Sequence, residues 1–262
     1  MKILAIEASG LTAGCAIAED GNLIGDYNIQ YKKTHSQTLV PMMDELKRMT
    51  DLDLGSVDAV ALTEGPGSFT GLRIGAATAK GIGLALDKPI LPIPTVDSLA
   101  FNLFGTEALV CPVMDARRHQ VYTGIYEEKT EPVCLLPQCA VSVEELAEEL
   151  NKRNREVIFL GDGVPVYRKV LDELVKVPHT YAPGHLALQR AATTAVLACL
   201  RYEKEKEACL VSADDFRPEY LRKSQAERQK EEAELHGKMA SLAAGRLVRD
   251  LEAEQQGRHG KN

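Results

Sequence analysis

Short apolar runs alternate with helically spaced apolar positions along the first part of the chain. Runs at residues 3–6 and 15–18 predict two buried strands, and Asp20 with Gly21 supplies a hairpin turn to a third strand at 23–29. A helix is predicted next, because apolar residues recur there at i, i+3, i+4 and i+7. Its apolar face consists of Leu39, Met42, Met43 and Leu46.

A further buried strand is predicted at 57–63, where the chain is apolar and partly β-branched. Segment 64–67 contains two glycines and a proline and ends that strand. A long helix is expected over about 68–86. The predicted order in this half is therefore strand, strand, strand, helix, strand, helix.

The second half of the chain repeats this order without a residue-level repeat. Ser142 and Glu145 form a capping box at the start of its first predicted helix. Its predicted strands lie at 109–114, 121–126, 133–136 and 157–160, and its later helices lie near 166–174 and 185–201.

Two βββαβα units in one chain are typical of the two-lobed actin/Hsp70/sugar-kinase-like (ASKHA) architecture. This is an α/β fold in which ATP lies between the lobes, but the fold alone does not predict nucleotide binding. We expect an N-terminal lobe at 1–106 that carries partner-docking helices and a C-terminal lobe at 107–223. A charged helical tail is expected at 224–262, either solvated or packed against a partner.

Composition narrows the choice of function. The 262 residues suffice for two modest domains. A formal net charge of −7 and an aromatic content of 5%, without tryptophan, disfavour a surface that holds nucleic acid by itself. The six cysteines form no CxxC pair and predict buried, reduced thiols. With no signal-peptide pattern and no apolar stretch of bilayer length, we expect a cytoplasmic protein.

The glycine-rich segment resembles a phosphate loop in its position. Gly65, Gly67 and Gly71 follow a predicted strand and open a helix. Their spacing is GxGxxxG, Pro66 lacks a backbone donor, and no lysine follows the glycines. A tight strand-to-helix turn is therefore the favoured interpretation.

The helix after this turn carries a small residue at every fourth position, at Gly71, Gly75, Ala79 and Gly83. Each glycine inside a helix costs about 1 kcal/mol relative to alanine. Close approach by another element must offset that cost, and the element is either a partner helix or the protein's own sheet. Because the other faces of the helix are also apolar, we favour the partner.

Polar residues at three points have alternative interpretations. His35 precedes a helix without a catalytic companion at motif spacing, so capping or partner contact is favoured over a role as base. Asp115 with Arg117 and Arg118 is either an anion site in the cleft or a solvated turn with local ion pairs. Asp162, between two glycines, predicts a turn.

Several segments in order carry a family resemblance. Segment 65–75 is similar to the hallmark segment of the TsaB family, dimerisation subunits of the bacterial machinery that makes threonylcarbamoyladenosine beside the tRNA anticodon. Glu7 and Ala8 stand where the family usually has Asp-Thr. The resemblance covers about residues 1–223 and rests also on segments 1–9, 35–41, 114–122, 159–163 and 217–222.

The resemblance implies a non-catalytic scaffold that binds a related, TsaD-like catalytic subunit, mainly through its two N-lobe helices, with a TsaE-like ATPase. Such a complex transfers threonylcarbamoyl from threonylcarbamoyl-AMP to N6 of a tRNA adenosine. This chain is then expected to hold no cofactor or metal, to meet tRNA only through the complex, and to form a homodimer when alone. The expected docking surface comprises His35, Leu39, Met42, Met43, Leu46, Gly71, Leu72, Arg73, Gly75, Ala76, Ala79 and Gly83.

Three alternatives stay open at this point: an ATP-dependent phosphotransferase of the same fold, a metallopeptidase, and a direct tRNA-binding module. Against the first, Glu7 and the bulky turn 116–119 replace the Asp and the small residues of nucleotide-binding members. Against the second, Thr95 and Leu99 stand where the catalytic relative has its HxxxH metal helix. The net charge of −7 disfavours the third.

Overall fold

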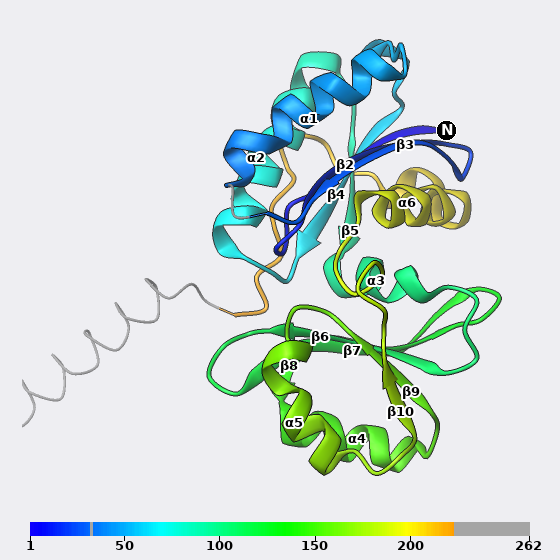
Figure 1. Ribbon diagram of the computed structural model, residues 1–262. Helices are drawn as coiled ribbons and strands as arrows, with labels where there is room; N and C mark the ends of the chain where they lie inside the picture. Colours follow the sequence, from blue (N-terminus) through cyan, green and yellow to red (C-terminus); the bar gives the residue numbers. More distant parts are fainter. Residues whose placement is uncertain (32–33, 223–262) are drawn as a thin grey trace, which may run out of the picture. The chain divides into compact units, whose positions relative to one another are not determined.

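Two five-stranded mixed sheets form the framework of the protein in the computed structural model, which describes residues 1–31 and 34–222 (Figure 1). The first sheet contains β1 (Lys2–Glu7), β2 (Ala13–Glu19), β3 (Asn22–Ile29), β4 (Ala59–Gly65) and β5 (Ile90–Pro94). The second contains β6 (Leu109–Asp115), β7 (Gln120–Glu128), β8 (Pro132–Ser142), β9 (Val157–Leu160) and β10 (His179–Tyr181).

The two sheets share one topology. The first has the order β3-β2-β1-β4-β5 and the second the order β10-β9-β6-β7-β8. If the strands are numbered within their own half and the second sheet is read from β8 to β10, both sheets have the strand order 3-2-1-4-5. In both, the first strand pairs antiparallel with the second and parallel with the fourth. This duplication confirms the predicted two-lobed ASKHA fold.

Helices occupy the same places in each half. The first half contains α1 (His35–Met49) and α2 (Phe69–Leu86), the second α4 (Val143–Arg153) and α5 (Val164–Leu174). A longer connection follows each fifth strand. These connections carry α3 (Thr95–Ala100) and α6 (Ala191–Glu205), which are followed by 3₁₀ turns at Phe101–Leu103 and Lys206–Cys209. A further 3₁₀ turn at Leu54–Ser56 lies between α1 and β4.

Local signals placed several elements correctly. Asp20 and Gly21 have φ of 50° and 77°, as the predicted hairpin turn requires. The capping box is present, with the Ser142 hydroxyl accepting from the backbone of Glu145 at 3.1 Å. Strands β5 and β10 were not predicted. β5 contains two prolines, which are unfavourable inside a sheet. It lies at the sheet edge, where missing backbone donors are tolerated.

Helices cover both faces of the first sheet (Figure 1). On one face Ile6 and Leu62 share a buried cluster with Leu39 of α1 and Ala79 of α2. On the other face α6 packs closely on the strands, because the residues it buries are small. The strands contribute Ile3, Ala5, Ala16, Ala18, Ala59, Ala61, Leu91 and Ile93 to this second cluster, and α6 contributes Ala191, Ala195, Ala198 and Cys199.

The position of α6 corrects one expectation. The helix near 185–201 was expected in the C-terminal lobe, but α6 packs on β1, β2 and β3 of the first sheet. Helical spacing identifies its buried face and not the sheet that this face meets. The division at residues 1–106 and 107–223 stays a proposal for the segments that build the two sheets.

The second sheet is covered by α4 and α5, whose buried residues form one cluster with Val113, Phe159 and their neighbours. Helix α3 contacts strands of both sheets. Its Leu99 shares a cluster with Val110 and Tyr126 of the second sheet. The two sheets are therefore joined through packed side chains as well as through the chain.

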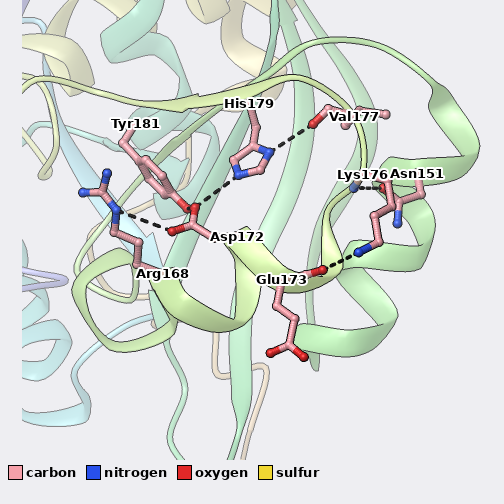
Figure 2. Close-up of polar contacts among 8 residues, drawn as sticks. All are labelled: Asn151, Arg168, Asp172, Glu173, Lys176, Val177, His179 and Tyr181. Atoms are coloured by element: carbon pink, nitrogen blue, oxygen red, sulfur yellow. Dashed lines mark hydrogen bonds and ion pairs between the residues drawn. The ribbon is translucent and has the colours of Figure 1, made fainter.

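A polar cluster ties α5 to the edge strand β10 (Figure 2). The Tyr181 hydroxyl donates to Asp172 at 2.6 Å, and His179 Nε2 lies 3.2 Å from the same carboxylate oxygen. These two contacts lower the pKa of Asp172. The Arg168 guanidinium lies over the Tyr181 ring, 4.2 Å from its centre. Because these contacts join side chains of α5 to side chains of β10, the cluster holds the edge strand against the helix.

Other expectations concern membranes, thiols and the tail. No helix among the described residues is long and apolar enough to cross a membrane. The cysteines are free, and burial raises the pKa of Cys15 and Cys111 to about 12. Cys134 is exposed, which corrects the expectation that the thiols are buried. The tail predicted at 224–262 lies outside the described residues.

Candidate functional site

The glycine loop before α2 is packed against the protein's own backbone. A Cβ added at Gly67 would lie 2.2 Å from the Ser9 carbonyl oxygen, and one at Gly71 would lie 2.1 Å from that of Ala8. The Ser68 backbone N–H donates to the Ser9 carbonyl at 2.7 Å. The glycines therefore allow the β1–β2 connection to approach α2. This confirms the tight turn and leaves no phosphate cradle on that side of the loop.

The small-residue ridge of α2 also faces inward, which corrects the predicted docking surface. A Cβ at Gly75 would lie 3.1 Å from both Ala8 Cβ and Leu62 Cδ1, and one at Gly83 would lie 2.9 Å from Ala213 Cβ. Small residues here let α2 approach its own sheet, as the alternative interpretation held. The four-residue spacing alone could not distinguish a partner helix from the protein's own sheet, because close packing against either one requires small residues along the helix.

The structure separates the remaining predicted docking residues by exposure. His35 and Met43 are half-buried, and only Arg73 is exposed, with its guanidinium 4.1 Å from the centre of the Phe69 ring. His35 Nε2 lies 3.0 Å from the Thr12 carbonyl and ties α1 to the β1–β2 connection. The residues buried inside the chain, besides the ridge, are Leu39, Met42, Leu46, Leu72 and Ala76.

The outward side of α2 carries a second series of small and apolar residues. Ala77, Gly81 and Ala85 are exposed and follow one another at four-residue spacing. A Cβ added at Gly81 meets nothing within 4 Å. Leu84 is 55% exposed beside them. A helix surface of this kind permits another helix to pack closely against it.

Helix α1 extends this surface. Val40 is 57% exposed and lies one turn before half-buried Met43. Met43 and Ile82 of α2 pack against the same two core clusters. The outer α1/α2 face is therefore defined by exposed and half-buried residues of both helices. It consists of Val40, Met43, Arg73, Ile74, Ala77, Thr78, Gly81, Leu84 and Ala85.

A buried polar row crosses the carboxyl end of the first sheet on its α6 side. Glu7 follows Ile3 and Ala5 along one face of β1, and Thr63 follows Ala59 and Ala61 on β4. The Glu7 carboxylate accepts from the Ser9 backbone at 2.7 Å, while its Oε2 has no partner at normal hydrogen-bond distance among the described residues. The Thr63 hydroxyl is near enough to act on the pKa of this carboxyl. Thr12, Thr63, Thr95 and Gln189 also have buried side-chain atoms without partners.

The burial of Glu7 makes the stability of the protein depend on pH. Loss of hydration raises its pKa from 4.5 to about 7, against the hydrogen bonds from Ser9. The folded state therefore binds the proton more tightly than the unfolded state, and stability falls as the pH rises from about 4.5 through 7. The loss is on the order of 3 kcal/mol for such a shift.

We expect Glu7→Gln to remove this part of the pH dependence. The variant should match the native protein near pH 5 and unfold at higher temperature near pH 8, because no buried carboxylate then forms. Thermal unfolding followed at both pH values measures the difference. Glu148→Gln, on the exposed side of α4, is the control. An unchanged difference between the two pH values in the Glu7 variant would contradict this account.

The turn between β6 and β7 is unusual in its backbone. Arg117, Arg118 and His119 have φ of 65°, 56° and 58°, a region that costs about 1–2 kcal/mol for each residue with a Cβ. Asp115 holds the turn by accepting from the Arg117 backbone at 2.8 Å and pairing with its guanidinium at 3.1 Å. Asp162 accepts from the Asp115 backbone at 3.3 Å, so it does more than form a turn.

This geometry tests the fit of the groups that the fold family implies. The protein's own backbone fills the space beside Gly67 and Gly71, and the second hairpin carries Arg117, Arg118 and His119 in place of small residues. Thr95 and Leu99 are fully buried on α3. Among residues 1–31 and 34–222, no three or more His, Cys, Asp and Glu side chains are grouped to hold a metal. The residues present therefore do not fit nucleotide phosphates at the glycine loop or a metal ion on α3.

A group of acids lies near α3, which contacts both sheets; Glu128 is buried, and Glu64 and Asp97 are half-buried. Asp97 of α3 accepts from the Tyr126 hydroxyl at 2.7 Å and lines a cavity of about 390 Å³ with Arg201 of α6. Burial raises the pKa of Asp97, and it raises those of Glu64 and Glu128 to about 7 and 8. No sequence pattern indicates this group, because its members come from distant segments and form no motif.

Comparisons with known proteins agree with one another. The family model described as "TsaD: tRNA N6-adenosine threonylcarbamoyltransferase" matches residues 28–230. The "tRNA threonylcarbamoyladenosine biosynthesis protein TsaB" of Bacillus subtilis (strain 168) is 32% identical over 228 residues, which are 87% of this chain and 96% of the relative. The protein of the same description from Escherichia coli (strain K12) is 26% identical over 86% of this chain and 96% of its own length.

Solved structures give the same result. "YeaZ from Pseudomonas aeruginosa" superposes with a TM-score of 0.71 at 25% identity, over 84% of this chain and 99% of that one. A second structure from the same organism, described as similar to "peptidase YEAZ", has a TM-score of 0.70 with the same identity and coverage.

Proposed function

The chain belongs to the TsaB family of tRNA threonylcarbamoyladenosine biosynthesis proteins, and we propose that it acts in that pathway as a non-catalytic docking subunit. Its partner is a TsaD-like catalytic subunit, with a TsaE-like ATPase joining the two. The assembled complex transfers threonylcarbamoyl from threonylcarbamoyl-AMP to N6 of the adenosine beside the tRNA anticodon. This chain then supplies a surface and not a reacting group.

The observation that carries the proposal is the outer α1/α2 face. It exposes Leu84 and Val40 beside the small residues Ala77, Gly81 and Ala85 on two helices that are already anchored to the sheet on their other sides. Glycine at position 81 costs helix stability, and in the described part of the chain a Cβ added there meets no other element within 4 Å. A helix of a partner that packs on this face offsets that cost. Because this face is exposed among the described residues, it also suits a homodimer.

The chemistry of the remaining molecule supports a non-catalytic role. The close backbone packing at the glycine loop and the bulky second hairpin disfavour nucleotide phosphates there. By the family resemblance, Thr95 and Leu99 of α3 replace metal-binding histidines. Both residues are fully buried. A subunit built in this way contributes to the reaction through assembly.

Mixing the chain with the TsaD-like subunit of the same organism tests the proposal. Size exclusion with light scattering should show a complex with the summed mass of both subunits. The chain alone should elute as a homodimer that exchanges for the hetero-complex when the partner is added. Failure of two folded proteins to associate at micromolar concentration would overturn the docking role. Nucleotide binding by the isolated chain would then become the next measurement.

A further inference from the structure

The β6–β7 turn places side chains where local stability disfavours them. Arg117, Arg118 and His119 are three consecutive residues in the left-handed region, which Gly, Asn and Asp adopt at lower cost. Two arginines and a histidine therefore occupy positions that a turn would fill with smaller residues for stability alone. Backbone strain that surrounding contacts maintain is typical of functional sites.

Buried groups hold the base of this turn. The Asp115 side chain is 12% exposed and accepts from the Arg117 backbone and from the Tyr167 hydroxyl at 3.1 Å. Asp162 in turn accepts from the Asp115 backbone. The Ala116 N–H donates to the Gln120 carbonyl at 3.0 Å and closes the turn. The backbone is therefore fixed from within.

The three side chains at the tip are exposed to solvent, and one of them also contacts the base. Arg117, Arg118 and His119 are all exposed, and the Arg117 side chain reaches 85% exposure although it pairs with Asp115. Because Asp115 already pairs with Arg117, the Arg118 guanidinium is the group that carries the argument. A guanidinium suits phosphate oxygens, which it contacts through paired N–H donors. An exposed tip recognises phosphates on an extended molecule, since it offers no walls to enclose a small one.

We propose that the tip Arg117–His119 binds the phosphate backbone of the RNA substrate once the catalytic partner holds that RNA. This inference rests on the proposed function and adds an RNA-contacting element to it. A net charge of −7 opposes RNA binding by the chain alone, so the tip adds contacts to an RNA already bound. The family resemblance implied contact with tRNA only through the complex, and this proposal adds a direct contact within that complex.

Arg118→Gly tests the proposal, because it removes the charge and the strain together. The complex with the TsaD-like subunit is titrated with an unmodified tRNA transcript at several salt concentrations. We expect roughly 3- to 10-fold weaker binding and a salt slope smaller by about 0.7–0.9. The isolated variant should unfold about 2–4 °C higher as strain is relieved. Arg118→Lys keeps the charge and should change neither quantity by as much.

The experiment separates results that contradict the RNA contact from a result that contradicts the proposed function. Unchanged RNA affinity and salt slope in Arg118→Gly would overturn the proposal, whatever its unfolding temperature. Loss of the protein complex itself in this variant would also overturn it and would assign the tip to the protein partner. If the native chain forms no complex, the proposed function fails and this inference fails with it. That outcome does not depend on residue 118.

Discussion

Gly81→Arg should abolish the complex with the TsaD-like subunit while the chain itself stays folded. A Cβ added at position 81 meets no other element of residues 1–31 and 34–222 within 4 Å, so we expect an arginine there to fit the isolated protein. In a close helix contact the same side chain separates the two axes and buries a charge. We expect binding to weaken by on the order of 100-fold or more, about 3 kcal/mol. Titration calorimetry against the partner measures this change.

Gly184→Arg is the matched control for this experiment. Gly184 is exposed, lies before α6 rather than on the outer α1/α2 face, and also has no neighbour within 4 Å. The control adds the same charge and volume and should leave binding unchanged. Equal loss of binding in both variants would point to net charge, and full binding by Gly81→Arg would remove this face from the interface.

Gly71→Ala should destabilise the fold by at least about 3 kcal/mol, although it adds a single carbon. That carbon would lie 2.1 Å from the Ala8 carbonyl oxygen, so either α2 or the β1–β2 connection must move. Neither segment can move without a cost in packing energy, because Ile6 and Leu62 of the sheet share a buried cluster with residues of α2. Chemical denaturation with matched slopes measures the difference in unfolding free energy.

Gly81→Ala provides the internal comparison for this second experiment. It makes the same change in the same helix, but outward, where it should stabilise the chain by about 0.5–1 kcal/mol. The two variants therefore differ in sign, and the difference reports which side of α2 faces the sheet. Similar effects at both positions would contradict the orientation of the helix.

Local patterns were sufficient for most of the fold. The Asp20–Gly21 turn and the Ser142 capping box involve neighbours in sequence, and both are present. The ridge from Gly71 to Gly83 was placed on the wrong side, because a helical pattern identifies a face and not its occupant. The acids Glu64, Asp97 and Glu128 come together only through tertiary packing, so no spacing could reveal them.

The backbone of the β6–β7 turn was equally hidden from sequence. Residue preferences assign left-handed positions to glycine and asparagine, and Arg117 and Arg118 carry neither signal. Contacts from Asp162 and Tyr167, distant in sequence, hold the base of the turn in place. Sites that depend on such remote support are the ones that local preferences miss.

The return of α6 to the first sheet sets an order on synthesis. One face of that sheet, which includes Ile3, Ala61 and Leu91, is covered by Ala191–Glu205. Those residues leave the ribosome only after the whole second sheet has been made. Until then the N-terminal strands carry an uncovered apolar surface, so the first lobe cannot mature while the chain is still short. The lobe that begins the protein is thus among the last parts to be completed.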